Sequence, residues 1–187
     1  MMDTQARGFD AQPELSNDRV RLRPMHPDDF AALFAVAGDP AIWAIHPAHD
    51  RWQEPVFRRF FAGGLASGGA MIIEDARTDD VIGSSRFDPT RAGAGEIEIG
   101  WTFLARSHWG GEVNRSVKRL MIAHALTGYD RVIFLVGERN ARSRRALEKI
   151  GAALTDRRHD VPLADTVARH VIYMVDRTRF ESGPLNR

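Results

Sequence analysis

The stretch EIEIGWTFLARSHWGGEVN, Glu96–Asn114, decides the fold. Its first half alternates between apolar and polar residues, which is the pattern of a strand with one buried face. The apolar face carries Ile97, Ile99, Trp101 and Phe103. Its second half passes through a glycine pair into a segment with apolar residues at helical spacing. Those residues are Val113, Val117, Leu120, Met121 and the pair His124/Ala125. The stretch therefore predicts a strand that leads through a glycine turn into a helix.

The glycine turn predicts an anion site. Backbone N–H groups at the start of a helix have no partner within the helix, and the helix dipole favours negative charge there. Gly110 and Gly111 stand at this start, and Glu96 and Glu98 lie on the polar face of the preceding strand. This arrangement indicates a phosphorylated cofactor held beside acid–base groups.

Length and composition predict one globular domain. The 187 residues are 43% hydrophobic and 27% charged, which is ordinary for a soluble protein. The chain has no cysteine, which excludes disulfides, thiol catalysis and cysteine metal sites. Its first residues lack the apolar segment of a signal peptide, and no stretch is long enough to span a bilayer. We therefore expect a cytoplasmic protein with no membrane partner.

Charge is distributed unevenly along the chain. Residues 1–55 carry five Arg and nine Asp or Glu, a net charge of −4. Residues 105–150 carry ten Arg or Lys and four Asp or Glu, a net charge of +6. A basic half around the glycine turn suits a polyphosphate ligand. Nucleic acid is the less favoured partner, because the basic residues are not interleaved with exposed aromatic ones and no nucleic-acid motif is present.

The remaining segments predict an α+β chain with a strand–helix–strand unit in the middle. The other predicted strands are Arg19–Met25, Ala70–Glu74, Val81–Phe87, Arg131–Val136, Ala153–Asp160 and Val167–Val175. The other predicted helices are Asp28–Ala37, Glu54–Leu65 and Asn140–Ile150. We expect a mixed, mostly antiparallel sheet of seven strands, flanked by about four helices in three layers. Residues 19–180 would form the single domain, with 1–18 as a loose lead-in and 181–187 as a tail.

In this order of elements the chain resembles the GCN5-related N-acetyltransferase superfamily, and within it the branch that includes ribosomal-protein N-terminal acetyltransferases. The matching pieces are RLRPMHPDDF (Arg21–Phe30), VIGSSRF (Val81–Phe87), Glu96–Asn114 and ERNARSRRALEKIGA (Glu138–Ala152). The resemblance implies an acyl-CoA N-acyltransferase fold and transfer of the acetyl group of acetyl-CoA to a primary amine. Two splayed strands would admit the pantetheine arm like an extra strand.

The resemblance also implies which residues contact acetyl-CoA. They are Phe103, Leu104, Arg106, Trp109, Gly110, Gly111, Glu112, Val113, Asn114, Asn140 and Ser143. A backbone N–H near Phe103 or Leu104 would bind the developing oxyanion. Arg106 would help to neutralise the pyrophosphate.

Two features bear on the charge around this cofactor. The loop departs from the family pattern, because Glu112 stands where a glycine is usual and Asn114 where a small residue is usual. A carboxylate repels a pyrophosphate, so we expect Glu112 to face solvent or to pair with Arg106 or Arg115. One face of the following helix carries Arg142, Arg145 and Lys149. These cations would either meet the 3′-phosphate of the cofactor or face solvent.

Acetyl transfer to an amine requires a base for the ammonium proton and an acid for the departing thiolate. Glu98 is the predicted base, with Glu96 behind it, and the alternative is that one or both are surface residues. Asn140 and Ser143 match the positions where relatives contact pantetheine and protonate the thiolate. Asn140 also suits a simple helix cap.

The acceptor amine would bind near the segment WAIHPAHDRW, Trp43–Trp52, where relatives build the lip of the acceptor pocket. We expect Trp43, His46 and Arg51 to line this pocket and Arg86 to point into it from a neighbouring strand. His46 and His49 have no third ligand nearby, so the sequence predicts no metal site.

Two classes of function fit these residues. The first is an acetyltransferase that acts on a protein N-terminus or a small-molecule amine. The second is a catalytically inactive module that binds and senses acyl-CoA. Glu98, Asn140 and Ser143 favour the enzyme, whereas Glu112 and Asn114 keep the sensor open. The identity of the amine, the use of longer acyl groups and the formation of a homodimer stay open.

Overall fold

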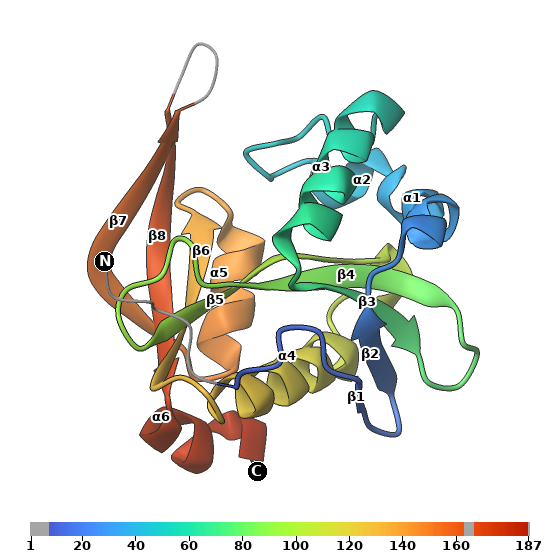
Figure 1. The fold of residues 1–187 in the computed structure, drawn as a ribbon. Coiled ribbons are helices and arrows are strands. Elements are labelled where there is room, and N and C mark those ends of the chain that lie inside the picture. The colour runs from blue at the N-terminus through green and yellow to red at the C-terminus, as the bar shows by residue number, and fades with distance from the viewer. Residues whose placement is uncertain (1–7, 163–166, 187) are drawn as a thin grey trace.

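The computed structural model describes residues 8–162 and 167–186. Eight strands in these residues form one sheet (Figure 1). They are β1 (Leu15–Ser16), β2 (Val20–Pro24), β3 (Ala70–Asp75), β4 (Val81–Asp88), β5 (Glu96–Leu104), β6 (Arg131–Gly137), β7 (Ala153–Pro162) and β8 (Val167–Asp176). Their order across the sheet is β1-β2-β3-β4-β5-β6-β8-β7. Every neighbouring pair is antiparallel except β5 and β6, so the sheet is mixed and mostly antiparallel, as expected.

Helices cover both faces of the sheet and define two apolar cores. The helices are α1 (Phe30–Ala37), α2 (Pro40–Trp43), α3 (Glu54–Ser67), α4 (Glu112–Ala125), α5 (Ala141–Lys149) and α6 (Arg177–Ser182). The larger core takes Val117 from α4 and Leu147 from α5. The smaller core takes Leu33 from α1, Trp43 from α2 and Phe57 from α3. Figure 1 shows α1, α2 and α3 together on one side of the sheet and α4 on the other. The expected three-layer α+β arrangement is confirmed.

A bulge at Trp101 reverses the faces of β5. Opposite Ser84–Arg86 of β4, the β5 strand carries one extra residue. Trp101 has a φ of 53°, a left-handed conformation that is uncommon for a bulky residue. Ile97 and Ile99 therefore pack into the larger core, whereas Phe103 packs into the smaller one. The expectation that all these apolar residues share one face was wrong, because an inserted residue moves the following side chains to the opposite face.

β5 and β6 separate after a short paired segment. The parallel register joins Glu96–Glu98 to Arg131–Ile133, whereas β5 continues to Leu104 and β6 continues to Gly137. The later part of each strand is not paired with the other, and this leaves an opening in the middle of the sheet. The opening is the splay of strands that the family resemblance implies.

Described residues near both ends of the chain pack against the rest of the domain. The sheet has eight strands rather than seven, because Leu15–Ser16 pairs with β2. Phe9, in the expected lead-in, packs against Phe87 and Tyr129. Leu185, in the expected tail, is buried. Sequence alternation missed β1 because a two-residue strand is too short to show a period.

Candidate active site

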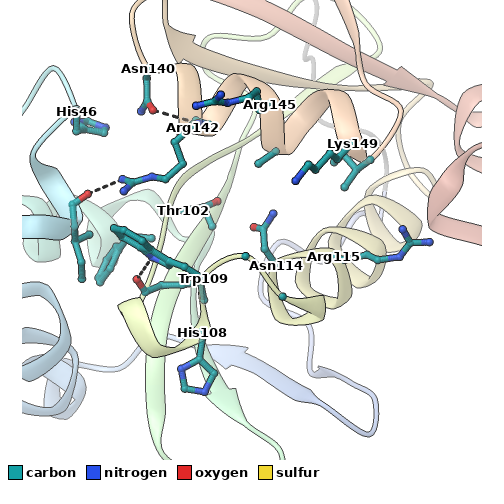
Figure 2. Close-up of a pocket in the computed structure, with 18 of the residues that line it drawn as sticks. His46, Thr102, His108, Trp109, Asn114, Arg115, Asn140, Arg142, Arg145 and Lys149 are labelled. Atoms are coloured by element: carbon teal, nitrogen blue, oxygen red, sulfur yellow. Dashed lines mark hydrogen bonds between the residues drawn. The ribbon is translucent and has the colours of Figure 1, made fainter.

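Two adjacent cavities lie where β5 and β6 diverge. Their volumes are about 640 Å³ and about 150 Å³, and the larger one has the size of a typical ligand site. The two cavities lie side by side, because seven residues line both: Trp43, His46, Thr102, Asn114, Asn140, Ser143 and Ala146. These residues come from α2 and the turn after it, from β5, from α4 and from the start of α5 (Figure 2).

The glycine turn forms one wall of the larger cavity. Gly110 has a φ of 71°, and Gly111 is the N-cap of the 14-residue helix α4. A Cβ placed on either glycine would have no described atom within 4 Å, so the space in front of the turn is open. Trp109 is held beside this space because its indole N–H donates to the Leu104 carbonyl at 2.9 Å. Phe103 and Leu104 line the same cavity. The arrangement leaves room for an anionic group at the start of α4.

Three residues expected near the cofactor differ in where they lie. Glu112 lines the larger cavity, but its side chain is 60% exposed and lies 3.8 Å from Arg115, so the carboxylate is solvated and pairs with a cation, as expected. Arg106 is exposed, pairs with Asp39 and lines neither cavity. Val113 also lines neither cavity and packs against the larger core. The geometry therefore gives Arg106 and Val113 no direct place beside a ligand in these cavities.

Cations from α5 line the wall opposite the glycine turn. Arg142, Arg145 and Lys149 all line the larger cavity, and Arg145 and Lys149 are also exposed to solvent. Arg142 reaches across the cavity, because its guanidinium lies 3.9 Å from the centroid of the Trp109 ring and donates to a backbone carbonyl of α2 at 2.9 Å (Figure 2). Arg115 of α4 lines the cavity as well. The glycine turn and the four cations are donor groups of the kind that a polyphosphate requires, and the one carboxylate of the described residues that lines the same cavity, Glu112, pairs with Arg115.

Asn140 caps α5 and also lines both cavities. Its side-chain oxygen accepts a hydrogen bond from the backbone N–H of Ser143 at 3.1 Å, which caps α5. Asn140 is also buried and lines both cavities. The Ser143 hydroxyl makes no hydrogen bond with the described residues, so it is free to contact a ligand.

Glu98 lies just behind the wall of the smaller cavity. It is 1% exposed and accepts two hydrogen bonds from Arg91, at 2.9 Å and 2.6 Å. Burial raises the pKa of Glu98 to about 7, and the charge and hydrogen bonds of Arg91 limit the rise. Gly100 lines the smaller cavity, and a Cβ placed on it would lie 2.6 Å from the Glu98 Oε1 atom. The missing side chain at Gly100 therefore leaves the carboxylate directly beside the cavity wall.

Glu96, unlike Glu98, does not lie beside a cavity wall but accepts hydrogen bonds from other segments of the chain. It accepts hydrogen bonds from Arg157 of β7 at 2.8 Å and 2.9 Å and from the backbone N–H of Gly93. Burial alone would raise the pKa of Glu96, but the hydrogen bonds from Arg157 and Gly93 outweigh burial and hold this pKa below its usual value. Glu96 lines neither cavity, and its contacts indicate a structural role.

Three of the four residues expected at the acceptor line the cavities. Trp43 and His46 line both, and Arg51 lines the smaller one. Burial lowers the pKa of His46 to about 3, and the charge of Arg51 acts in the same direction. The imidazole is therefore neutral at physiological pH, and its Nδ1 accepts the backbone N–H of Ala48 at 2.9 Å. Arg86 is buried and lines neither cavity.

Lys118 was missed by the sequence interpretation. It is 5% exposed and lines the smaller cavity. Its Nζ donates to the Thr102 hydroxyl at 2.8 Å and lies 5.3 Å from the centroid of the Phe134 ring. Burial lowers the pKa of Lys118 to about 7. A signal was available, because Lys118 stands four residues after Asn114 and four before buried Ile122 on the inward face of α4.

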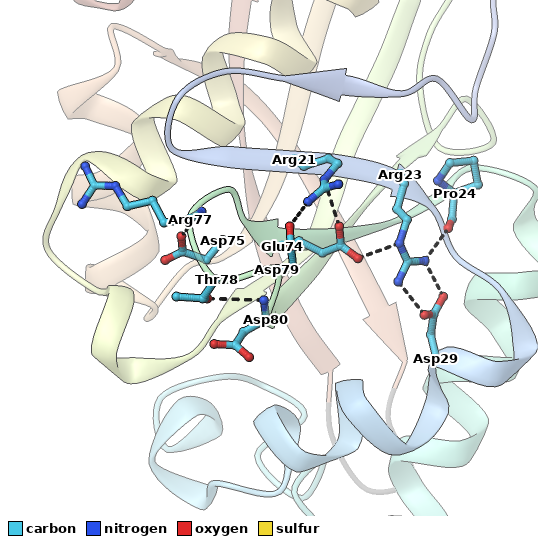
Figure 3. Close-up of polar contacts among 10 residues, drawn as sticks. All are labelled: Arg21, Arg23, Pro24, Asp29, Glu74, Asp75, Arg77, Thr78, Asp79 and Asp80. Atoms are coloured by element: carbon cyan, nitrogen blue, oxygen red, sulfur yellow. Dashed lines mark hydrogen bonds and ion pairs between the residues drawn. The ribbon is translucent and has the colours of Figure 1, made fainter.

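A second polar cluster lies outside the cavities and satisfies its own charges (Figure 3). Arg23 of β2 donates to Glu74 of β3 at 2.7 Å and to both carboxylate oxygens of Asp29. Arg21 pairs with Glu74 and with Asp79. These contacts join β2 to β3 and to the start of α1, and they leave no obvious group for a ligand.

Neither a metal centre nor a membrane span is found among residues 8–162 and 167–186. No group of three or more His, Asp or Glu in these ranges is placed to hold a metal ion. No helix within the same ranges has the length and apolar character needed to cross a bilayer.

Comparison with known proteins identifies the family. A family model described as an acetyltransferase (GNAT) domain matches residues 19–153, and the chain belongs to this family. Among curated proteins, the uncharacterized protein YkkB of Bacillus subtilis (strain 168) is 28% identical over 165 residues. That match covers 83% of this chain and 95% of YkkB.

Solved structures share the fold. A GCN5-related N-acetyltransferase from Brucella melitensis matches with a TM-score of 0.77 and 17% identity, over 94% of this chain and 83% of that one. Mycobacterium smegmatis RimJ, solved in complex with CoA-disulfide, matches with a TM-score of 0.68 and 17% identity, over 92% of this chain and 90% of that one. The acyl-CoA N-acyltransferase fold expected from the resemblance is confirmed.

Proposed function

We propose that this protein transfers the acetyl group of acetyl-CoA to a primary amine, on a protein N-terminus or on a small molecule. The observation that carries the proposal is the pair of adjacent cavities at the splay of β5 and β6, with a glycine turn on one wall and cations on the other. Acetyl-CoA would supply the activated acetyl thioester. The family of acetyltransferases to which the chain belongs and the RimJ structure with CoA-disulfide support the same function.

The chain offers a donor for each part of the cofactor. The backbone N–H groups of Gly110 and Gly111 and the cations on α4 and α5 would bind its phosphates. Asn140 would contact the pantetheine arm beside the free edge of β5. A backbone N–H near Phe103 or Leu104 would stabilise the negative charge that develops on the thioester oxygen.

The reaction moves two protons. The amine nitrogen bonds to the thioester carbon as the carbon–sulfur bond breaks, so one proton leaves nitrogen and one reaches sulfur. We assign Glu98 to the first transfer, through a water that reaches it past Gly100, because a carboxylate with a pKa of about 7 is a competent base at neutral pH. We assign the Ser143 hydroxyl to the second, because it lines both cavities. The hydroxyl would recover its proton from solvent.

The direct test measures release of the CoA thiol from acetyl-CoA over a panel of free amino acids, polyamines, aminoglycosides and short peptides. A thiol-reactive dye reports CoA alone, because the protein has no cysteine. Release that depends on an added amine and on Glu98 would support the proposal. Mass spectrometry of the amine would verify that it gains an acetyl group.

A second candidate function is an acyl-CoA sensor without transfer activity. It is favoured by the Glu98 carboxylate, which accepts two hydrogen bonds from Arg91 and lines neither cavity. A sensor would show no amine-dependent thiol release with any acceptor, while acetyl-CoA would still raise the melting temperature.

A further inference from the structure

Of the residues that the structure describes, Arg51 is the permanent cation that lines the smaller cavity, because burial lowers the pKa of His46 to about 3, that of Lys118 to about 7 and that of His170 below its usual value. The ionisable residues of this cavity are His46, Arg51, Lys118 and His170, and no Asp or Glu of the described residues lines it. The cavity shares seven lining residues with the larger one and lies beside it, so its contents would lie next to the end of the cofactor site. A lining with a permanent cation and without a carboxylate bears on which amines can bind at this position.

Arg51 is held by aromatic rings and not by a counter-ion. Its guanidinium lies 4.8 Å from the centroid of the Phe60 ring and 5.5 Å from that of Trp43. It makes no hydrogen bond or ion pair within the described part of the chain. Burial lowers the pKa of Arg51 to about 10, while the charge of Asp50 opposes this shift and that of Arg86 adds to it. Its five N–H donors are therefore available to a ligand.

Arg86 is a second guanidinium that makes no hydrogen bond or ion pair with any residue the structure describes. It is 8% exposed, and its Nε is buried without a hydrogen bond. Its guanidinium stacks 4.3 Å from the centroid of the Trp101 ring, which lines the smaller cavity. The carboxylates whose charges act on Arg86 are those of Asp88 and Glu98, and both have other partners. Asp88 accepts a hydrogen bond from Thr90, and Glu98 accepts hydrogen bonds from Arg91. Burying two cations near one cavity without a counter-ion lowers the free energy of unfolding, unless an anion binds beside them.

We propose that the acceptor is a small amine that carries its own carboxylate, as an amino acid does. Arg51 would bind this carboxylate, and the nearby guanidinium of Arg86 would add positive charge to the subsite. The inference rests on the acetyl transfer proposed above and names its substrate class. A planar carboxylate matches the fork of N–H donors on a guanidinium. Its negative charge would also offset the positive charges of Arg51 and Arg86, whereas a polyamine would add to them.

The same cations serve the chemistry of the amine. A positive environment lowers the pKa of a bound ammonium group and so favours the neutral amine that attacks the thioester. The carboxylate would keep the acceptor bound while its amine loses a proton. Binding and activation would then depend on one set of residues.

The test uses amines in matched sets of four. Each set contains an α-amino acid, its carboxamide, the amine without the carboxyl group, and the analogue in which a phosphonate replaces the carboxylate. We expect kcat/KM for the acid to exceed that for the amide and the simple amine by about 10- to 100-fold, the value of a charge-assisted hydrogen bond. A preference for the phosphonate would show that the subsite takes a tetrahedral oxyanion and would overturn the carboxylate assignment. Equal or better use of the uncharged analogues or of spermine would overturn the inference altogether.

The protein variant is Arg51→Gln, with Arg58→Gln as its matched control. Arg58 also lies against a phenylalanine ring in the same region, 4.2 Å from the centroid of Phe30, but it is exposed and lines neither cavity. Arg51→Gln should reduce the preference for acid over amide by about tenfold or more, and Arg58→Gln should leave it unchanged. An equal loss of rate with acid and amide in Arg51→Gln would contradict the proposal.

A binding measurement separates this inference from the proposed reaction. Trp43 and Trp101 line the smaller cavity, so their fluorescence should report a ligand there. The protein with CoA would be titrated with N-acetyl amino acids and with the corresponding amides. Saturable quenching by the acids alone, weakened in Arg51→Gln, would support the anion subsite even if no amine released CoA. Identical responses to acids and amides would reject the subsite, whatever the transfer assay shows.

Discussion

The carboxylate of Glu98 accepts two hydrogen bonds from the guanidinium of Arg91, at 2.9 Å and 2.6 Å. The pair has one buried and one partly exposed member, since the Glu98 side chain is 1% exposed and that of Arg91 is 28% exposed. Arg91 also lies 4.4 Å from the centroid of the Trp101 ring, which lines the smaller cavity. The proposed base is therefore held by a residue that itself rests on the cavity wall.

Glu98→Gln should lower the rate of acetyl transfer by about 10²- to 10⁴-fold, the usual effect of losing a general base. Burial raises the pKa of Glu98 to about 7, and the residue must be ionised to accept a proton. The wild-type rate should therefore rise with pH through about 7 and level off above it. Rates measured from pH 5.5 to 9 at saturating acetyl-CoA would test this. Glu138→Gln, at an exposed position, serves as the control.

Arg91→Met provides a second check on the same assignment. Arg91 limits the pKa of Glu98, so its loss should move the acidic limb of the profile to higher pH. A profile that keeps its position in Arg91→Met, together with a Glu98→Gln rate close to wild type, would remove Glu98 from the mechanism.

The sequence predicted most of the fold because the central elements show clear periodicity. The strand from Glu96 and the helix from Glu112 both lie where alternation and helical spacing placed them. The bulge at Trp101 was not predictable, because a single inserted residue leaves no trace in a short alternating pattern. Leu15–Ser16 gave no signal for a similar reason, since strand pairing there depends on β2 and not on local propensity.

The candidate site was predictable where a sequence motif falls at a predicted turn or at the start of a predicted helix. The glycine turn, Asn140 and Ser143 follow from a strand–turn–helix and a capped helix, and all of them line the cavities. Arg106 has the right charge and sequence position, but Asp39, far away in the sequence, binds it outside the cavities. Lys118 was missed because a single lysine among apolar residues of a helix more often extends to solvent. Partners that are far apart in the sequence, such as Asp39 and Arg106, cannot be identified from one sequence.

Lys118→Met should change how stability depends on pH. Burial lowers the pKa of Lys118 from 10.5 to about 7, so between these values the unfolded chain binds a proton that the folded chain lacks. The free energy of unfolding of the wild type should then rise with pH, by up to ~1.4 kcal/mol per pH unit from this group. Below pH 7 the buried ammonium is charged in both states and its full cost remains. Lys118→Met should therefore be more stable than wild type at low pH, with a difference that shrinks toward pH 10.

Urea unfolding from pH 6 to 10 measures this difference, and Lys149→Met is the matched control. Lys118 and Lys149 are the two lysines of the chain, and Lys149 is exposed. Lys149→Met should differ from wild type by a constant amount over this pH range. Parallel curves for Lys118→Met and wild type would show that the ammonium of Lys118 is not destabilised by burial.

Arg142→Gln should weaken the binding of CoA by about tenfold, the value of one charge-assisted hydrogen bond. Arg142 lines the larger cavity and contacts Trp109 across it, so its loss removes a cation from the proposed phosphate site and opens the cavity. Calorimetric titration with CoA measures the effect. Arg139→Gln is the control, because Arg139 lies just before the same helix, is exposed and lines neither cavity. Equal affinities in the two variants would contradict the cofactor site.

Asn140→Ala should lower both stability and cofactor affinity, because Asn140 caps α5 and lines both cavities. Loss of the cap should reduce the free energy of unfolding by about 1 kcal/mol. Asn140→Ser separates the two effects, since a serine hydroxyl still accepts the Ser143 N–H but offers no amide N–H to a ligand. We expect Asn140→Ser to unfold at nearly the wild-type urea concentration and still to show a raised KM for acetyl-CoA. A wild-type KM in both variants would leave Asn140 as a helix cap alone, and the side-chain contact to pantetheine would then have to come from another residue at the splay.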